Sequence, residues 1–474
     1  MQPCFLAVDI GASSGRHIVG TVQDGKITLQ EVYRFENGVR RENGRLCWNI
    51  DALAAEVVNG LKAAHDAGYT PATIGIDTWA VDFVLLDADG QRIGDAVAYR
   101  DERTEGMREA LERDYGLTFA EHYARTGIQY QKFNTVYQLM ALKKEHPEQL
   151  AAAKTFLMVP DYLNYLLCGV AANEYTNAST TALVGADSKD WDDALIAMLG
   201  LPRDIFQSIK TAGTVLGHLT PEMQAKVGFD AEVILPATHD TGSAFLAVPA
   251  RDEFAAYLSS GTWSLLGVEN AAAITSADSC AANFTNEGGY EYRYRYLKNI
   301  MGLWMIQSVR RELGEQNGTR PSFPELIAAA KEAADFASCV DPNDSRFLAP
   351  ASMIEEVKAA CRDTHQPMPQ TTGEVMQCIY NSLTQDYRRA IETLQALTGK
   401  TYTSLNIVGG GSQDGYLNQL TANATGLPVF AGPTEGTALG NLMVQFIHAG
   451  VFADLAEARA AIKRSFEIKE YNPQ

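Results

Sequence analysis

Residues Val233–Val248 read VILPATHDTGSAFLAV, and residues Ala255–Leu266 read AAYLSSGTWSLL. Two short apolar runs within them, Val233–Leu235 and Ala255–Leu258, predict buried strands. Small, hydroxylated or acidic residues follow each run, namely His239-Asp240-Thr241-Gly242 and Ser259-Ser260-Gly261-Thr262. A carboxylate just past a strand end, facing a glycine-hydroxyl turn, suits a base that must meet a phosphate. We therefore predict that Asp240 is that base and that the second turn is part of a phosphate cradle.

The amino-terminal stretch FLAVDIGASSGRHIVGTV predicts a strand, a glycine-serine turn and a second strand, with a third strand at Lys26–Phe35. The turn Gly11–Gly15 can wrap a phosphate with backbone N–H groups and serine hydroxyls, although taken alone it also fits an ordinary hairpin. Asp9, at the end of the first strand, is a candidate Mg²⁺ ligand, directly or through water. The turn matches the letters of a serine-hydrolase elbow, but that motif requires a strand-to-helix turn.

Composition limits the class of protein. A chain of 474 residues exceeds the roughly 250–300 at which one core usually splits, so two domains are expected. The 58 acidic and 39 basic residues give a net charge of −19, which argues against a nucleic-acid partner. A nucleotide that arrives as its Mg²⁺ complex remains compatible with this charge.

The sequence predicts neither secretion nor a membrane span, because it has no run of about 18 apolar residues and no signal-peptide pattern. Seven scattered cysteines favour a reducing cytoplasm. Cys361 and Cys378 are moderately close in sequence, and whether they form a disulfide stays open.

Helical and strand patterns alternate along the first half. Asp51–Gly68 has helical spacing of apolar residues, with Asn49 or Asp51 as cap. A strand then leads to Asp77 and Asp82, which fit either sugar-hydroxyl ligands or turn caps equally well. Residues 100–230 are predicted to be mostly helical.

The second half repeats this scheme. Phe254–Glu269 predicts another hairpin, Thr372–Gly399 a long helix, and 404–412 a strand that opens onto three glycines. We interpret this as an internal duplication of one nucleotide-binding α/β fold. The boundary is expected near residues 245–252, which would put the Asp240 strand end and the Gly261 turn on opposite sides of an interdomain cleft.

Five motifs carry a family resemblance: DIGASSGR, GIDTWAVD, HDTGS, LSSGTWS and IVGGGSQ, in that order. They resemble the FGGY family of carbohydrate kinases, which belongs to the actin-like ATPase superfamily. The resemblance implies two duplicated actin-like ATPase (ribonuclease H-like) domains with a central interdomain cleft. Residues 1–247 would bind sugar and phosphate, and residues 248–474 would bind the nucleotide.

Further segments resemble the branch of this family that acts on L-rhamnulose: YRDERT, PDYLNYLL, NEYTNASTT, TNEGG and LKNIMGLW. This resemblance implies ATP-dependent phosphorylation of the ketose at its 1-hydroxyl, with Mg²⁺ as cofactor.

The resemblance also implies roles for individual residues. Asp240 would be the proton acceptor and Asp9 the metal organiser. Contacts to ATP would come from Ala12, Ser13, Ser14, Gly15, Arg16, Thr262, Gln307 and Gly410. Contacts to the sugar would come from Ala80, His239, Asp240, Thr241 and Asn299. Ala80 stands where the family motif usually carries glycine, so its added methyl group could narrow the pocket.

Other functions remain as alternatives. A kinase for fuculose, xylulose or ribulose would differ in few pocket contacts. A chaperone-type or filament-forming ATPase of the same superfamily would turn over ATP without sugar, and a sugar sensor would bind without catalysis. The sequence is compatible with a monomer or a dimer.

Overall fold

The computed structural model describes residues 3–474. The chain divides into two compact units. Unit 1 contains the described residues up to Ala247 together with Glu269–Tyr296 and Gly436–Ser465. Unit 2 contains Val248–Val268, Leu297–Glu435 and Phe466–Gln474. The chain thus passes from unit 1 to unit 2 after Ala247, at the end of the predicted range 1–247. Two later segments, Glu269–Tyr296 and Gly436–Ser465, return to unit 1, whereas the prediction placed all of residues 248–474 in the second domain.

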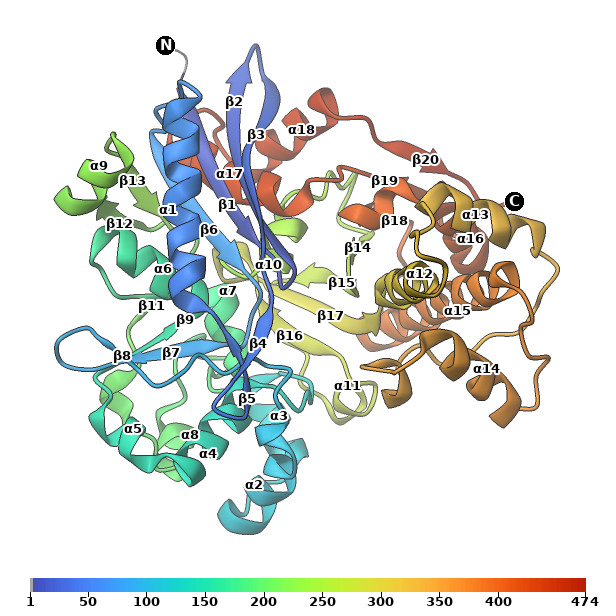
Figure 1. Cartoon of the computed structure of the whole chain (residues 1–474), viewed down its shortest axis with the longest axis horizontal. Helices are drawn as coiled ribbons and strands as arrows, with labels where there is room; N and C mark the ends of the chain where they lie inside the picture. The colour runs from blue at the N-terminus through green and yellow to red at the C-terminus, as the bar shows by residue number, and fades with distance from the viewer. Residues whose placement is uncertain (1–2) are drawn as a thin grey trace. The chain divides into compact units, whose positions relative to one another are not determined.

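A six-stranded sheet of order β12-β13-β6-β1-β2-β3 forms the centre of unit 1 (Figure 1). Strand β1 pairs parallel with β6 and antiparallel with β2, and β13 pairs parallel with β6. The predicted amino-terminal hairpin of three strands is confirmed, and Gly11–Gly15 connects strand to strand, which excludes the hydrolase elbow. The strands are β1 (Cys4–Ile10), β2 (Ser14–Gln23), β3 (Lys26–Glu36), β6 (Thr73–Thr78), β12 (Val215–His218) and β13 (Glu232–Ile234).

Helices cover both faces of this sheet. Successive side chains of β1 point to opposite faces, and all of them are buried, so each face needs a covering layer. Leu6 and Val8 belong to a core that includes Leu53 and Val57 of α1 (Ile50–Asp66). That face also carries α6 (Val159–Cys168) and α9 (Pro221–Val227). The helix α1 begins after Asn49, whose side chain accepts a hydrogen bond from the amide of Ala52, so asparagine is the cap.

The opposite face carries α17 (Gly436–His448), which comes from the end of the chain. Phe5 of β1 meets Phe446 of α17 edge to face, with ring centroids 5.2 Å apart. The helix α17 also packs against α10 (Asp240–Leu246), and α18 (Leu455–Ser465) packs against β3. These contacts explain why residues 436–465 belong to unit 1.

The remainder of unit 1 is mostly helical between residues 100 and 230, as predicted. Its helices are α2 (Met107–Tyr115), α3 (Phe119–Thr126), α4 (Thr135–Glu145), α5 (Pro147–Ala152), α7 (Tyr175–Ala178), α8 (Asp193–Met198) and α11 (Ala277–Ala281). Its smaller strands are β4 (Val39–Glu42), β5 (Arg45–Trp48), β7 (Phe83–Leu86), β8 (Arg92–Ile93), β9 (Thr155–Met158), β10 (Asn173–Glu174), β11 (Ile209–Lys210) and β16 (Thr285–Gly288).

Unit 2 repeats the strand order of unit 1, which confirms the predicted duplication. Its strands run in the order β17-β15-β14-β18-β19-β20. Strand β14 pairs antiparallel with β15 and parallel with β18, as β1 does with β2 and β6. The strands are β14 (Ala255–Ser260), β15 (Trp263–Asn270), β17 (Tyr294–Met301), β18 (Ser404–Val408), β19 (Val429–Ala431) and β20 (Lys469–Tyr471).

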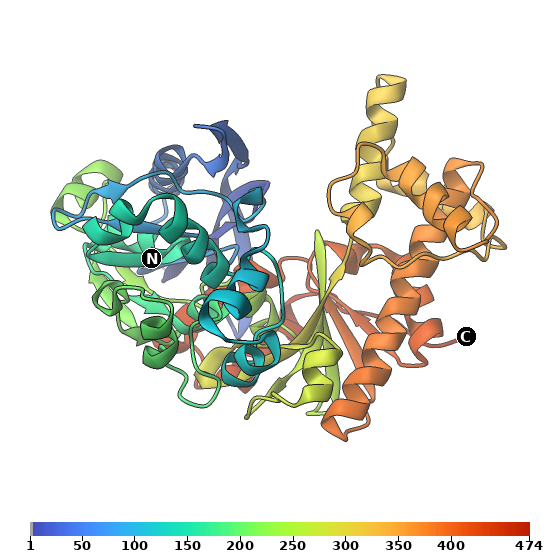
Figure 2. The same cartoon turned by 90° about the horizontal axis from the view of Figure 1, so that it is seen from below.

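The long helix α15 (Thr372–Thr398) runs beside this second sheet (Figure 2). It begins with a capping box between Thr371 and Glu374 and stops at Gly399, whose φ of +67° favours glycine, as predicted. The other helices of unit 2 are α12 (Trp304–Asn317), α13 (Phe323–Glu332), α14 (Met353–Asp363) and α16 (Gly415–Thr425).

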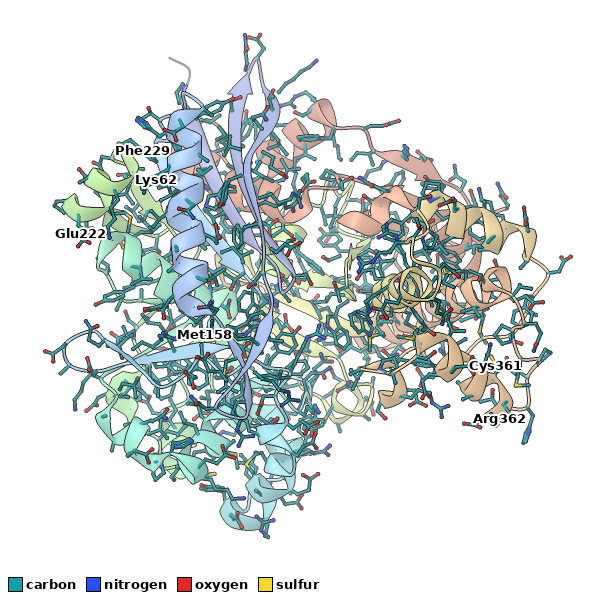
Figure 3. The ribbon with its side chains drawn as sticks, viewed as in Figure 1. Lys62, Met158, Glu222, Phe229, Cys361 and Arg362 are labelled. Carbon is teal, nitrogen blue, oxygen red and sulfur yellow. The ribbon has the colours of Figure 1, made fainter. Side chains whose placement is uncertain are left out.

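Cys361 lies on α14, where Figure 3 labels it, and its sulfur atom is 3.7 Å from that of Cys378 on α15. Both are free thiols in the structure. Among residues 3–474, no helix is both long enough and apolar enough to cross a lipid bilayer.

Candidate active site

Three carboxylates lie at or just past strand ends in the central sheet of unit 1. Asp9 of β1 and Asp77 of β6 are direct neighbours in the parallel register. Asp240 is the first residue of α10, and the preceding His239 forms a β-bridge with Thr78 at the end of β6. The carboxyl ends of parallel strands meet at one edge of a sheet, where α/β proteins usually bind ligands. The structure therefore brings the predicted base and the predicted metal ligand to the same edge.

Asp77 is buried completely and lies between charged neighbours. Burial raises the pKa of Asp77 well above its usual value, and the charges of Asp9 and Asp240 raise it further. Asn441 of α17 donates to one carboxylate oxygen at 2.6 Å. Arg16 donates to Asp9 at 2.7 Å and so offsets part of the negative charge.

Asp240 has one oxygen engaged and one open. Thr241 donates to Oδ1 of Asp240 from its backbone nitrogen at 2.6 Å and from its hydroxyl at 3.1 Å. Nε2 of His239 lies 3.5 Å from the same oxygen. The hydrogen bonds assigned to Asp240 among residues 3–474 all reach Oδ1, which leaves Oδ2 able to accept a proton.

The environment of Asp240 changes the pKa of its carboxyl group. Burial raises the pKa of Asp240, the proximity of His239 lowers it, and the charge of Asp9 raises it again. About 31% of the side chain nevertheless stays exposed, so a substrate hydroxyl can reach it. A raised pKa makes an ionised carboxyl a stronger base.

Glu174 holds the loop that leads to the base, and sequence reasoning gave it no role. Its Oε2 accepts from the backbone nitrogen and the hydroxyl of Thr238, both at 3.0 Å. The backbone nitrogen of Thr176 donates to the same oxygen at 2.9 Å, and its hydroxyl donates as well. Burial raises the pKa of Glu174, while these four bonds oppose the rise. The only signal in the sequence was its place in the family-like segment NEYTNASTT.

Replacing Glu174 with glutamine is expected to lower the free energy of unfolding by about 1 kcal/mol, because hydrogen bonds to a charged acceptor become bonds to a neutral one. The loop at Thr238 should loosen, and the KM for sugar should rise. Thermal unfolding and steady-state kinetics measure the two effects. The matched control is Glu112→Gln on the exposed side of α2. Equal stability of the two variants would contradict this role.

The turn after β6 contains the predicted sugar ligand Ala80. Its carbonyl accepts from the backbone nitrogen of Asp82 at 2.9 Å, and the alanine is partly exposed. Asp82 is buried and accepts from the ring nitrogens of Trp48 and Trp79, at 2.6 and 3.0 Å. Two further donors, the side chain of Gln138 and a backbone nitrogen, complete its shell. The sequence leaves Asp82 open as either a sugar-hydroxyl ligand or a turn cap, and these four donors favour a structural role for it.

The Gly11–Gly15 turn is folded tightly on itself. The backbone nitrogen of Gly11 donates to the carbonyl of Ser14 at 2.9 Å, and Asn37 donates to the carbonyl of Gly11 at 2.9 Å. Ala12 and Ser13 at its tip are at least partly exposed. A Cβ atom at position 15 would lie 2.1 Å from the ring of Phe35, so any larger residue there would force that ring to move.

In unit 2 the predicted nucleotide residues Thr262, Gln307 and Gly410 lie on connected elements. The backbone nitrogen of Trp304, at the start of α12, donates to the carbonyl of Thr262 at 3.2 Å, and Gln307 is one turn further along that helix. A Cβ on Gly411 would lie 1.9 Å from the hydroxyl of Ser260, so the glycines let the two turns approach.

Gly410 and Asn299, two predicted ligand contacts in unit 2, each have room or bonding capacity for a ligand. A Cβ on Gly410 would meet nothing within 4 Å, so its backbone faces open space. Asn299 lies on β17, and its Oδ1 is buried without a hydrogen-bond partner among residues 3–474. An unpartnered buried acceptor of this kind is a reasonable ligand contact.

Comparison with known proteins covers almost the whole chain. The sequence model for the FGGY family of carbohydrate kinases, N-terminal domain, matches residues 4–247, and that for the C-terminal domain matches residues 256–449. A relative from Oceanobacillus iheyensis named rhamnulokinase is 50% identical over 471 residues, which cover 99% of this chain and 98% of the relative. One from Bacillus subtilis with the same name is 42% identical over 471 residues, which cover 99% and 95%.

Solved structures share the fold. Gluconate kinase from Lactobacillus acidophilus has a TM-score of 0.81 at 16% identity, covering 100% of this chain and 94% of that one. Glycerol kinase from Plasmodium falciparum, solved with ADP, has a TM-score of 0.78 at 14% identity, covering 100% and 95%. The two-domain fold with duplicated actin-like ATPase domains is thereby confirmed.

Proposed function

Because the chain belongs to the FGGY family of carbohydrate kinases, we propose that it phosphorylates L-rhamnulose at the 1-hydroxyl with ATP, giving L-rhamnulose 1-phosphate and ADP. One observation supports this substrate above other ketoses: relatives named rhamnulokinase are 42–50% identical over nearly their full length. The matched lengths cover 99% of this chain and so include residues of both units.

Asp240 would be the general base in this reaction. Its open Oδ2 would take the proton of the sugar 1-hydroxyl while that oxygen forms a bond to the γ-phosphorus. The bond from the γ-phosphorus to the bridging oxygen breaks at the same time, and ADP leaves. Phosphoryl transfer depends mainly on positioning the substrates and neutralising charge. The general base therefore gives a further acceleration beyond that from the alignment of the sugar hydroxyl with the γ-phosphate.

The other predicted residues would bind the two substrates. Ala12, Ser13, Ser14, Gly15 and Arg16 would contact the phosphates of ATP, and Thr262, Gln307 and Gly410 would contact the rest of the nucleotide. Ala80, His239, Thr241 and Asn299 would contact the sugar. In this assignment residues 1–247 serve mainly sugar and phosphate, and residues 248–474 serve the nucleotide.

A Mg²⁺ ion would enter with the nucleotide, and Asp9 would hold it directly or through water. Carboxylate oxygen is a suitable donor, and Asp9 lies at the sheet edge beside Arg16. Among residues 3–474, no group of three or more His, Cys, Asp or Glu side chains forms a complete metal site. Most ligands would therefore be phosphate oxygens and water, as is usual for Mg²⁺. Bound there, the ion would neutralise charge on the phosphates.

The chain would work in the cytoplasm, because seven scattered cysteines in a chain of this length fit a reducing compartment. Monomeric and dimeric forms both fit this function.

A panel of ketoses tests the substrate assignment. L-Rhamnulose, fuculose, xylulose and ribulose are each given with ATP and Mg²⁺, and ADP release is followed by a coupled assay. We expect kcat/KM to be highest for L-rhamnulose, by about tenfold or more, because a site that binds substrate hydroxyls rejects altered stereochemistry. A higher value for another ketose would reassign the substrate.

The same assay separates the alternatives from other classes. ATP turnover that is independent of sugar would favour a chaperone-type or filament-forming ATPase. Sugar binding without a phosphorylated product in mass spectrometry would favour a sensor.

A further inference from the structure

A buried ion pair lies behind His239 in unit 1. Arg295, at the unit 1 end of β17, is only 1% exposed, and its Nη2 lies 3.1 Å from Oε2 of Glu287 in β16. The Nε of Arg295 donates to the carbonyl of Gly288 at 2.8 Å, which fixes the plane of the guanidinium. The same Nη2 lies 3.0 Å from Nδ1 of His239. The charged group thus contacts the ring nitrogen that faces away from Asp240.

The direction of this hydrogen bond follows from chemistry. A guanidinium only donates hydrogen bonds, so the Nδ1 of His239 that meets Arg295 must carry its lone pair. Oε2 of Glu287 is also near Nδ1, but at the longer distance of 3.4 Å, and its closer contact is with Arg295. The carboxylate therefore balances the buried arginine charge. A proton on Nδ1 would point at an N–H of arginine and is disfavoured.

We infer that Arg295 holds His239 as the neutral tautomer with its proton on Nε2, directed to the side of the ring where Asp240 lies. Nε2 is 3.5 Å from Oδ1 of Asp240. His239 then donates a hydrogen bond, to Asp240 or to a sugar oxygen, and cannot accept the substrate proton at Nε2. Arg295 is a positioning residue, and its importance for turnover rests on the proposed roles of His239 and Asp240.

The tautomer can be measured on the unaltered protein. The full chain is labelled with ¹⁵N-histidine, and long-range ¹⁵N–¹H spectra are recorded near neutral pH. Comparison with the His239→Gln variant assigns the signal among the eight histidines. We expect Nδ1 to be unprotonated and Nε2 to be protonated. A protonated Nδ1, as either the other tautomer or the imidazolium, would overturn the inference, whatever sugar the enzyme accepts.

A variant tests whether Arg295 is the cause. In Arg295→Met the proton of His239 should move to Nδ1, where Glu287 can accept it, and the KM for the ketose should rise about two- to tenfold, the effect of losing one neutral hydrogen bond to the sugar. The KM for ATP should change little. The matched control is Arg293→Met, two residues away and exposed. An unchanged tautomer in a variant with wild-type circular dichroism would refute the role of Arg295.

Discussion

Replacing Asp240 with asparagine is expected to lower kcat at least about 100-fold, because general-base assistance typically contributes 10²- to 10⁴-fold. Asparagine has the same shape, and its oxygen can still accept the bonds that Thr241 donates to Oδ1. The start of α10 should therefore stay folded, and ATP binding should remain close to that of the wild type. Single-turnover kinetics and nucleotide titration measure the two effects.

Asp66→Asn is a suitable control for the loss of one carboxylate, since Asp66 is exposed at the end of α1. The pH dependence gives a second test of Asp240. A carboxyl with a raised pKa must be ionised to accept a proton, so kcat/KM should fall as pH falls through that raised value. In Asp240→Asn this acid limb should disappear. Near-normal turnover of the variant would remove Asp240 from the role of base.

Local patterns in the sequence were enough to predict much of the fold. The apolar residues of Thr372–Thr398 recur with helical spacing, and Gly399 stops the helix, because both features depend only on neighbours along the chain. The strand ends near Asp9 and Asp77 were predictable for the same reason. The duplicated strand order followed from the repeated hairpin, helix and strand in each half.

Long-range polar contacts could not be predicted in this way. Arg295 stands in an alternating strand, where a charged residue usually faces solvent, but a buried partner, Glu287, makes the inward position stable. The sequence allowed Asp82 to bind a sugar hydroxyl, but Trp48, Trp79 and Gln138 already donate hydrogen bonds to its carboxylate oxygens. Some of these partners are distant in sequence, and the others belong to no sequence pattern that predicts a contact.

The position of α17 could not be predicted from the sequence either. Its apolar residues predict a buried helix, but periodicity does not say which sheet it covers. The decisive contacts are specific: Asn441 donates to Asp77, and Gln445 donates to the carbonyl of Leu6 in β1 at 3.0 Å. Two amides, one helical turn apart, thus bind α17 to this sheet, and Asn441 reaches the edge that carries the acidic residues.

Gly440 lets α17 lie directly against α10, the helix that begins with Asp240. A Cβ at position 440 would lie 1.7 Å from the carbonyl oxygen of Ser243 and 2.4 Å from its carbonyl carbon. These are backbone atoms and cannot move aside as a flexible side chain can. We therefore expect Gly440→Ala to lower the free energy of unfolding of unit 1 by about 3 kcal/mol, at the upper end of the usual cost of overpacking.

The same substitution should also lower kcat, because α10 can only relieve the clash by moving Asp240 with it. A small misplacement of a catalytic group can reduce the rate by about 10²-fold. Thermal unfolding and turnover of Gly440→Ala are compared with those of Gly38→Ala, where a Cβ would meet nothing within 4 Å. Equal melting temperatures and rates would show that α10 and α17 do not pack closely through Gly440. If stability falls while kcat is unchanged, α17 supports the fold without positioning Asp240.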